Sequence, residues 1–245
     1  MPAAISVSDI RKSYGDLRAV DGVSFEVTPG EFFGILGPNG AGKTTTLEII
    51  EGLRQADAGE ATVLGMPAWP RNRALLPRIG VQLQASAFFE RLTAREQLGT
   101  FTSLYGVPAG RVDEMLHVVG LTDKAGTRTE KLSGGQAQRL CIARTLAVEP
   151  DVVLMDEPCS ALDPIATSAI EDLMRDIKQR YTIVIVTHNM QQATRVSDRT
   201  AFFSVLRNEE SDTRTGVLVE YGRTQQIFED PHDDRTRAYV TGRMG

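Results

Sequence analysis

The chain contains few of the residues that commonly bind metals or form cross-links. Among its 245 residues there are 2 cysteines and 3 histidines. Neither Cys141 nor Cys159 has the spacing to histidines that is typical of a metal site. We therefore interpret both cysteines as small buried thiols of a protein that works in a reducing compartment.

The chain also has no long apolar run and no excess of positive charge. Its most apolar stretch, TIVIV at 182–186, is far shorter than the ~20 residues that a membrane-spanning helix needs. The first 17 residues contain no apolar core of the kind found in signal peptides. With 27 Lys and Arg against 32 Asp and Glu, the net charge is −5. We expect a soluble, cytosolic chain that has no nucleic acid as a partner.

Short apolar strands and amphipathic helices alternate in the second half of the chain. Helices are predicted at 134–150 and 166–180, and strands at 151–158 and 181–188. Strands that are apolar along their whole length and alternate with helices predict a parallel sheet covered on both faces.

The remaining segments extend this α/β pattern at both ends. Four further stretches have patterns typical of strands or helices: strands are predicted within 5–36, and helices at 42–54, 92–106 and 111–121. Residues 200–245 predict strands around a charged turn, followed by a short polar helix.

A phosphate-binding loop lies between the first strands and the first helix. The stretch GILGPNGAGKTT, residues 34–45, matches the pattern G-x-x-x-x-G-K-[ST]. It follows an apolar strand and opens a helix, which is the context that the pattern requires. In such loops backbone N–H groups surround the phosphates, the lysine (Lys43) reaches the β- and γ-phosphates, and the hydroxyl of Thr44 binds Mg²⁺.

Two acids at the end of a later strand complete this pattern. In DVVLMDEP, Asp156 stands at the carboxyl end of an apolar strand, where α/β sheets bind their ligands. An aspartate in that position holds the metal in P-loop nucleotide hydrolases. Glu157 follows directly and is either a general base for the attacking water or a solvated loop acid.

A second glycine-rich turn opens the helix predicted at 134–150. The run LSGGQ occupies residues 132–136. Adjacent glycines indicate a close backbone approach or a positive φ, and a helix N-terminus behind them favours phosphate. One chain thus has two candidate phosphate-binding turns.

With these motifs the whole chain resembles the ATP-binding subunits of ABC transporters. GPNGAGKTT (37–45) resembles the Walker A motif of that family, VVLMDE (152–157) its Walker B motif, LSGGQ its signature, and SALD (160–163) its D-loop. The resemblance implies an α/β fold, a P-loop NTPase of the ABC ATPase type. This fold has a mainly parallel sheet core, an N-terminal antiparallel β part and an inserted helical subdomain.

The resemblance also implies roles for individual residues, with ATP and Mg²⁺ as cofactors. Catalysis would involve Glu157, the switch histidine His188 and the Q-loop residue Gln84, and the metal would be bound by Thr44, Gln84 and Asp156. Tyr14 would stack on adenine. The other residues implied in nucleotide binding are Gly37, Pro38, Asn39, Gly40, Ala41, Gly42, Lys43, Thr44, Thr45, Ser133, Gly134, Gly135, Gln136 and Asp163.

In this family the P-loop of one subunit and the signature of a second enclose each ATP, which accounts for the two glycine turns. The resemblance thus implies a homodimer, integral membrane permease subunits as partners, and a location at the cytoplasmic face of the membrane. It also implies one domain over 1–245. Its parts would be a β part with the P-loop (1–83), a helical subdomain with the signature (84–135), a further core part (136–199), and C-terminal strands and helix (200–245).

The two halves of the chain resemble different transporters. Residues 133–245, with DEPCSALDPIATSAIEDL and the ending YVTGRMG, are similar to ATPases of bacterial phosphate importers. Residues 5–130, with NGAGKTT and a short spacing between Gln84 and Leu132, are similar to ATPases of drug and polysaccharide exporters. The sequence favours phosphate import, which brings in an extracytoplasmic phosphate-binding protein as a partner. An exporter ATPase, a soluble ABC ATPase outside transport and a small-molecule kinase stay open as alternatives.

Overall fold

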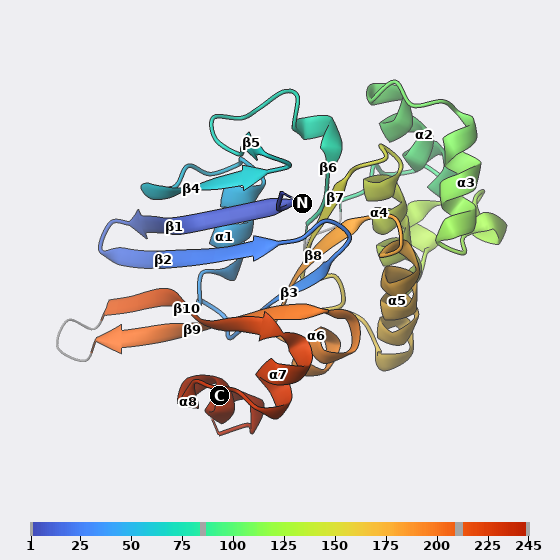
Figure 1. The fold of residues 1–245 in the computed structure, drawn as a ribbon. Helices are drawn as coiled ribbons and strands as arrows, with labels where there is room; N and C mark the ends of the chain where they lie inside the picture. The colour runs from blue at the N-terminus through green and yellow to red at the C-terminus, as the bar shows by residue number, and fades with distance from the viewer. Residues whose placement is uncertain (1, 84–86, 209–212, 244–245) are drawn as a thin grey trace.

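The computed structural model describes residues 2–83, 87–208 and 213–243, so Gln84 lies outside the described residues. A ten-stranded mixed sheet runs through the molecule in the order β5-β4-β1-β2-β10-β9-β3-β8-β7-β6 (Figure 1). Its strands are β1 (Ile5–Tyr14), β2 (Leu17–Val27), β3 (Phe32–Leu36), β4 (Ala58–Val63), β5 (Met66–Pro67), β6 (Ile79–Gln82), β7 (Val152–Asp156), β8 (Thr182–Thr187), β9 (Arg199–Asn208) and β10 (Thr213–Arg223).

The sheet consists of a parallel part and an antiparallel part. Strands β9, β3, β8, β7 and β6 pair in parallel, so their carboxyl ends lie at one edge, whereas β5, β4, β1 and β2 form an antiparallel ribbon. The β9–β10 hairpin joins the two, because β10 also pairs with β2 at Thr215 and Arg18. This mixed sheet confirms the predicted fold class.

The parallel strands are buried on both faces, as their apolar sequences predicted. In β8 the side chains of Val184 and Val186 belong to one core with β1, β2 and α1 (Lys43–Ile50), whereas Ile183 and Ile185 belong to a second core on the opposite face. Alternation of this kind follows from the two-residue period of a strand. The second core also contains apolar residues of α4 (Gly134–Leu146) and α5 (Pro164–Ile177).

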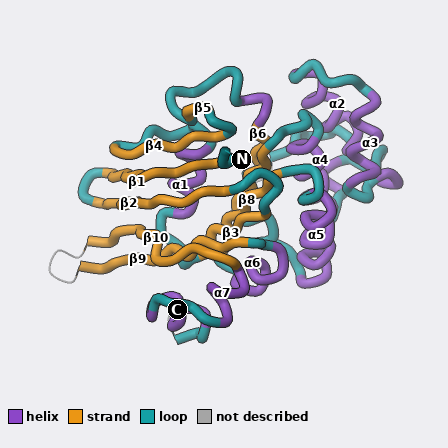
Figure 2. The backbone as a smooth tube through the Cα atoms, in the orientation of Figure 1, coloured by secondary structure: helices purple, strands orange, loops and turns teal. Residues whose placement is uncertain are grey.

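Two helices stand apart from the antiparallel strands. Helices α2 (Ala94–Leu104) and α3 (Gly110–Val118) pack beside α4 at the end of the molecule remote from β1 and β2 (Figures 1 and 2). Thr93 and Glu96 form a capping box that fixes the start of α2. We call α2 and α3 the helical block.

The structure shifts several predicted bounds. Helix α1 ends at Ile50 and α4 at Leu146, each a few residues before the predicted end, whereas α5 begins earlier because Asp163 caps it. The sequence pattern missed β4, β6 and the seven-residue α6 (Met190–Val196), which are too short for a clear period. The tail holds two helices in place of one, α7 (Thr224–Glu229) and α8 (Asp234–Val240). Among the described helices, none has the length and apolar character that crossing a membrane requires.

Candidate active site

The P-loop connects the buried end of β3 to the start of α1. A Cβ atom added at Gly37 would lie 2.2 Å from the carbonyl oxygen of Phe203, and one at Gly42 would lie 2.3 Å from that of Ala19. Gly42 also has φ 86°, which side chains rarely adopt. Both positions therefore require glycine, and the loop backbone presses against the neighbouring strands as it turns into the helix.

The Lys43 side chain lies inside this loop. Its Nζ donates hydrogen bonds to the carbonyl oxygens of Gly37 at 2.8 Å and Pro38 at 2.9 Å. Burial lowers the pKa of Lys43, with Glu157 and Asp156 opposing the shift. The lysine is thus held by weak neutral acceptors, and phosphate oxygens would offer it stronger, charged ones.

Thr44 and Asp156 meet where α1 begins and β7 ends. The Thr44 hydroxyl donates to Asp156 Oδ2 at 3.3 Å. Burial raises the pKa of Asp156, and its Oδ1 atom has no hydrogen-bond partner within the described parts of the chain. A hydroxyl and an orphaned carboxylate oxygen side by side are hard oxygen ligands, so these two residues fit Mg²⁺.

Glu157 and His188 form the next pair along the same edge. Glu157 Oε1 and His188 Nδ1 are 2.8 Å apart. Glu157 has φ 48°, a left-handed conformation unusual for a residue with a side chain, and its N–H donates to the Val186 carbonyl. Backbone strain of this kind is concentrated at functional sites. Here it accompanies the turn that places Glu157 at the sheet edge immediately after the buried Asp156.

Lys43, Thr44, Glu157 and His188 line one cleft of about 330 Å³. Tyr14 stands at its edge with 40% of its surface exposed, and the guanidinium of Arg54 lies 5.1 Å from its ring centre. The cleft therefore combines a partly exposed aromatic ring with the phosphate loop and the acid–histidine pair. Its lining residues are Tyr14, Leu17, Ala19, Asn39, Gly40, Gly42, Lys43, Thr44, Thr45, Glu157 and His188.

The second glycine turn lies outside this cleft. Ser133 caps α4 in a capping box with Gln136, and neither Gly134 nor Gly135 has a positive φ. A Cβ at Gly135 would lie 2.9 Å from that of Ala166, so this glycine lets α4 pack closely on α5. Residues 133–136 do not line the cleft.

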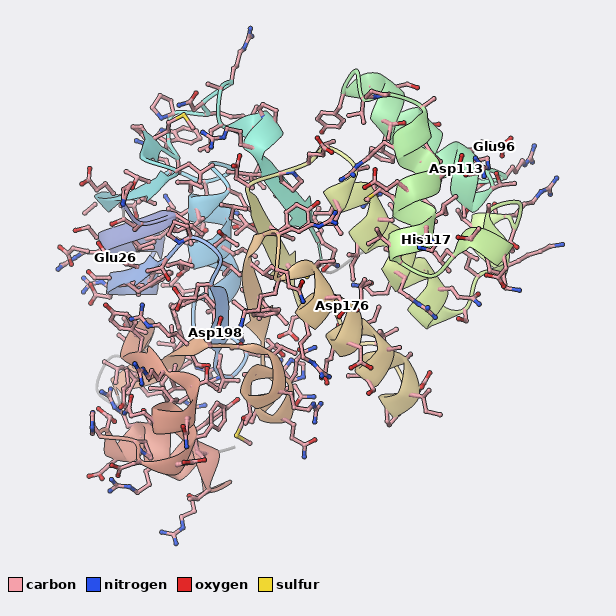
Figure 3. All side chains as sticks on the ribbon, turned by 45° about the vertical axis from the view of Figure 1, so that its right-hand side comes forward. Glu26, Glu96, Asp113, His117, Asp176 and Asp198 are labelled. Carbon is pink, nitrogen blue, oxygen red and sulfur yellow. The ribbon has the colours of Figure 1, made fainter. Side chains whose placement is uncertain are left out.

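Asp163, predicted at the nucleotide, also has a structural task. Its Oδ1 accepts the N–H groups of Ile165 and Ala166, both at 2.9 Å, and so caps α5. The other two histidines lie elsewhere: His117 is on α3 in the helical block (Figure 3), and His232 lies beside Glu220.

Two residues near the site were missed by the sequence analysis. The hydroxyl of Tyr239 donates to the His188 carbonyl at 3.3 Å. At the end of α1, burial raises the pKa of Glu51 to about 8, with Asp156 and Glu48 adding to the shift. Both effects depend on tertiary contacts, although the ending YVTGRMG did mark the segment of Tyr239.

We expect Glu51→Gln to stabilise the nucleotide-free protein at alkaline pH. Between its usual pKa of 4.5 and about 8, folded Glu51 keeps a proton that the unfolded chain has released. Stability then falls as pH rises, at about 1.4 kcal/mol per pH unit for one proton. The variant has no such pH-dependent loss, so its free energy of unfolding should exceed the wild-type value by up to about 4 kcal/mol at pH 8 and by about 1 kcal/mol at pH 5. Urea unfolding at both pH values, with exposed Glu60→Gln as control, measures this; equal pH slopes for wild type and variant would contradict it.

We expect Tyr14→Ala to weaken ATP binding by about tenfold, because stacking of a base on an aromatic ring contributes about 1–3 kcal/mol. Calorimetric titration with ATP under non-turnover conditions measures the change, and Tyr14→Phe should bind as the wild type does. Tyr221→Ala is the matched control, since Tyr221 is 39% exposed and also faces a guanidinium, that of Arg199 at 4.9 Å. Unchanged affinity in Tyr14→Ala would remove the stacking role.

The loop around Lys43, the Thr44–Asp156 contact and the adjacent Glu157–His188 pair define a P-loop nucleoside-triphosphatase. The family model described as ABC transporter matches residues 20–160, and the chain belongs to this family.

Relatives and a structure with a similar fold agree with this membership. The phosphate import ATP-binding protein PstB 1 of Mycobacterium bovis is 41% identical, over 100% of both chains. PstB 5 of Trichormus variabilis is 40% identical over 99% of this chain and 97% of the relative. The structure of cbiO1 from Clostridium perfringens, described as part of the ABC transporter complex cbiONQ, has TM-score 0.82 at 24% identity, covering 99% and 97% of the two chains. It shares the fold.

Proposed function

We propose that the chain binds ATP with Mg²⁺, hydrolyses it, and drives transport across a membrane as an ABC ATPase subunit. The observation that carries this proposal is the gathering of Lys43, Thr44, Asp156, Glu157 and His188 at the carboxyl edge of the parallel strands. Phosphoryl transfer to water needs a group that binds the phosphates, ligands for the metal ion, and a base for the attacking water, and these residues provide all three.

Each residue has one task in this mechanism. Lys43 exchanges the loop carbonyls for β- and γ-phosphate oxygens, Thr44 and Asp156 hold Mg²⁺, and Glu157 accepts a proton from the attacking water. Mg²⁺ held by these two residues would supply positive charge against the negative charge that develops on the phosphate oxygens. His188 shares a hydrogen bond with Glu157, and its other ring nitrogen is proposed to face the γ-phosphate. Gln84 is proposed to complete the metal and water contacts, and Tyr14 to stack on adenine.

We propose further that the active unit is a homodimer. The cleft of one subunit contains the P-loop but not the signature residues 133–136, which supports their action on the nucleotide of a second subunit. In that arrangement the N-terminus of α4 would direct its N–H groups and partial positive charge at the γ-phosphate. Asp163, at the N-terminus of α5, would approach the same interface.

The transported substrate is proposed to be inorganic phosphate, moving inward. The support is the likeness to phosphate import ATP-binding proteins, which extends over the whole chain and includes residues 5–130. The partners would be integral membrane permease subunits, which hold the ATPase at the cytoplasmic face, and an extracytoplasmic phosphate-binding protein. Residues 1–245 would act as one ABC ATPase domain, with the helical block in contact with the permease.

An exporter ATPase is the second candidate. The observation in its favour is the stretch NGAGKTT together with the short spacing between Gln84 and the signature. A soluble ABC ATPase is the third, but the chain contains a single P-loop and no heptad run.

Uptake of labelled phosphate tests the proposed function. In the cells that encode the chain, we expect replacement of its gene by the Glu157→Gln form to reduce phosphate uptake at least about tenfold, because transport then lacks hydrolysis. Uptake of an unrelated amino acid, and cells with the exposed control Glu60→Gln, should be unchanged. Normal phosphate uptake with a lost drug efflux would favour the exporter, and recovery of the chain on ribosomes without a permease would favour the soluble class.

A further inference from the structure

A cavity of about 560 Å³ lies behind the phosphate loop, between that loop, the β9–β10 hairpin and α8. It shares only Asn39 and Gly40 with the nucleotide cleft. In Figure 1, α8 lies on the β9–β10 side of the sheet, away from the helical block. The cavity is lined by Pro38, Asn39, Gly40, Ser204, Val205, Arg207, Arg214, Tyr239 and Arg243. We call it the arginine cavity.

Three arginines and no acidic residue line the arginine cavity within the described chain. Arg207 and Arg214 are directly paired across β9 and β10, so their side chains lie on the same face of the hairpin. Like charges in that position repel each other. In residues 2–83, 87–208 and 213–243, none of the ion pairs contains Arg207, Arg214 or Arg243. The described lining of the cavity is therefore positively charged, whereas the chain as a whole has a net charge of −5.

The end of α8 directs the third arginine to the same place. Gly242 has φ 70°, its N–H donates to the Tyr239 carbonyl, and the Arg243 N–H donates to the Ala238 carbonyl. This pair of bonds is a Schellman motif, which ends the helix in a fixed turn. The segment YVTGR thus places Tyr239 and Arg243 at one cavity.

Tyr239 links the arginine cavity to the catalytic edge. Its ring packs on Phe202 at 4.8 Å between centroids, and its hydroxyl donates to the His188 carbonyl at 3.3 Å. His188 in turn contacts Glu157 at 2.8 Å. A ligand that displaces α8 would therefore also displace Tyr239, whose hydroxyl is hydrogen-bonded to the backbone carbonyl of His188.

We propose that the arginine cavity binds a phosphate-bearing anion in addition to the nucleotide in the main cleft, and that its occupancy changes hydrolysis through Tyr239. Three guanidinium groups with up to five N–H donors each suit a multiply charged phosphate, which each can bind through two parallel hydrogen bonds. The anion is either a free phosphate compound or the phosphate chain of a second nucleotide. Binding at this site stands independently of the proposed function, whereas the effect on turnover rests on it.

The binding test uses the full chain with its main cleft saturated by Mg²⁺ and ADP. Inorganic phosphate, pyrophosphate and, in a separate arm, further ADP are then titrated by calorimetry. We expect one additional site, weakened about tenfold or more in Arg207→Gln and in Arg243→Gln, and weakened by salt. Response to phosphate or pyrophosphate alone identifies a free anion, and response to ADP alone identifies a nucleotide.

Arg180→Gln is the matched control, because Arg180 is an exposed arginine that does not line the cavity. It should bind the anion as the wild type does, and all three variants should keep ADP affinity and melting temperature. No additional site in the ADP-saturated wild type would overturn the proposal. Unchanged anion binding in both Arg207→Gln and Arg243→Gln would also overturn it. A third contrary result is that the two variants lose only dimer formation in sedimentation, because the arginines would then form a contact between subunits.

The rate of ATP hydrolysis with and without the anion tests whether binding in the arginine cavity changes turnover. We expect Arg243→Gln to keep basal ATP hydrolysis and lose its response to the anion. Tyr239→Phe should bind the anion within about twofold of wild type and lose the response, because the bond to His188 is gone. A full response in Tyr239→Phe would overturn the coupling. Absence of any hydrolysis in the wild type would count against the proposed function and leave the binding result valid.

Discussion

Glu157→Gln is expected to lower ATP hydrolysis by about 100-fold or more while ATP affinity stays within a few fold. Glutamine has nearly the same shape and keeps an oxygen beside His188, but it cannot accept a proton from the attacking water. Positioned proton acceptors contribute about 10²- to 10⁴-fold to such reactions. Lys43, Thr44 and Asp156 are unchanged, so the contacts proposed for ATP and Mg²⁺ persist. Phosphate release and ATP titration measure the two effects.

The same variant should accumulate as an ATP-bound dimer in size-exclusion chromatography, because the proposed link between subunits is no longer hydrolysed. Glu149→Gln is a matched control, because Glu149 also has a left-handed backbone, with φ 54°. Glu149 follows the end of α4, and its carboxylate lies 3.3 Å from the guanidinium of Arg111 on α3. It should turn over at the wild-type rate. Unchanged turnover in Glu157→Gln would remove this residue as the base.

Ser133→Arg is expected to reduce hydrolysis more than about tenfold while single subunits still bind ATP. The side chain of Ser133 is exposed at the start of α4, outside the cleft of its own subunit. In the proposed dimer a long cationic side chain there would obstruct the partner's γ-phosphate and block closure. The cost to the fold is limited to a lost cap, about 1 kcal/mol. Hydrolysis and ATP affinity at several protein concentrations separate dimerisation from binding.

Thr93→Arg is the control for this loss of a cap. Thr93 begins α2 with the same kind of capping box, but it lies in the helical block, where no contact with nucleotide is proposed. It should melt at a temperature similar to that of Ser133→Arg and hydrolyse ATP normally. Equal ATP hydrolysis by Ser133→Arg and Thr93→Arg would contradict a nucleotide site shared between two subunits. So would a wild-type hydrolysis rate that rises strictly linearly with protein concentration from the lowest concentrations.

Local patterns were sufficient to predict the part of the site that depends on chain geometry. The Walker A spacing fixed the loop between strand and helix, and the apolar run before Asp156 placed that acid at the sheet edge, because these motifs set their own backbone. Gly135 was different. Its glycine pair indicated a close backbone approach, and the structure shows that approach to Ala166 on the next helix. The contact with phosphate stays a prediction.

Features that arise from tertiary packing could not be predicted. The contact between Tyr239 and His188 joins residues 51 positions apart. The raised pKa of Glu51 depends first on burial and then on the negative charges of Asp156 and Glu48. Strand β6 and helix α6 are short, so their few residues show no period strong enough to distinguish them from loops. Short motifs also did not decide the transporter type. The motifs within residues 5–130 resembled those of exporters, whereas the relatives aligned with the whole chain are phosphate import proteins.

The tight packing at Gly135 has a mechanical consequence. Ser133 caps α4 and Asp163 caps α5, and the two helices touch where a side chain on Gly135 would clash with Ala166. Close-packed helices resist independent displacement. A displacement of the helical block, which packs against α4, would therefore move the N-termini of α4 and α5 together. A bulky residue at position 135 would separate α4 from α5, so that Ser133 and Asp163 would no longer move as one unit.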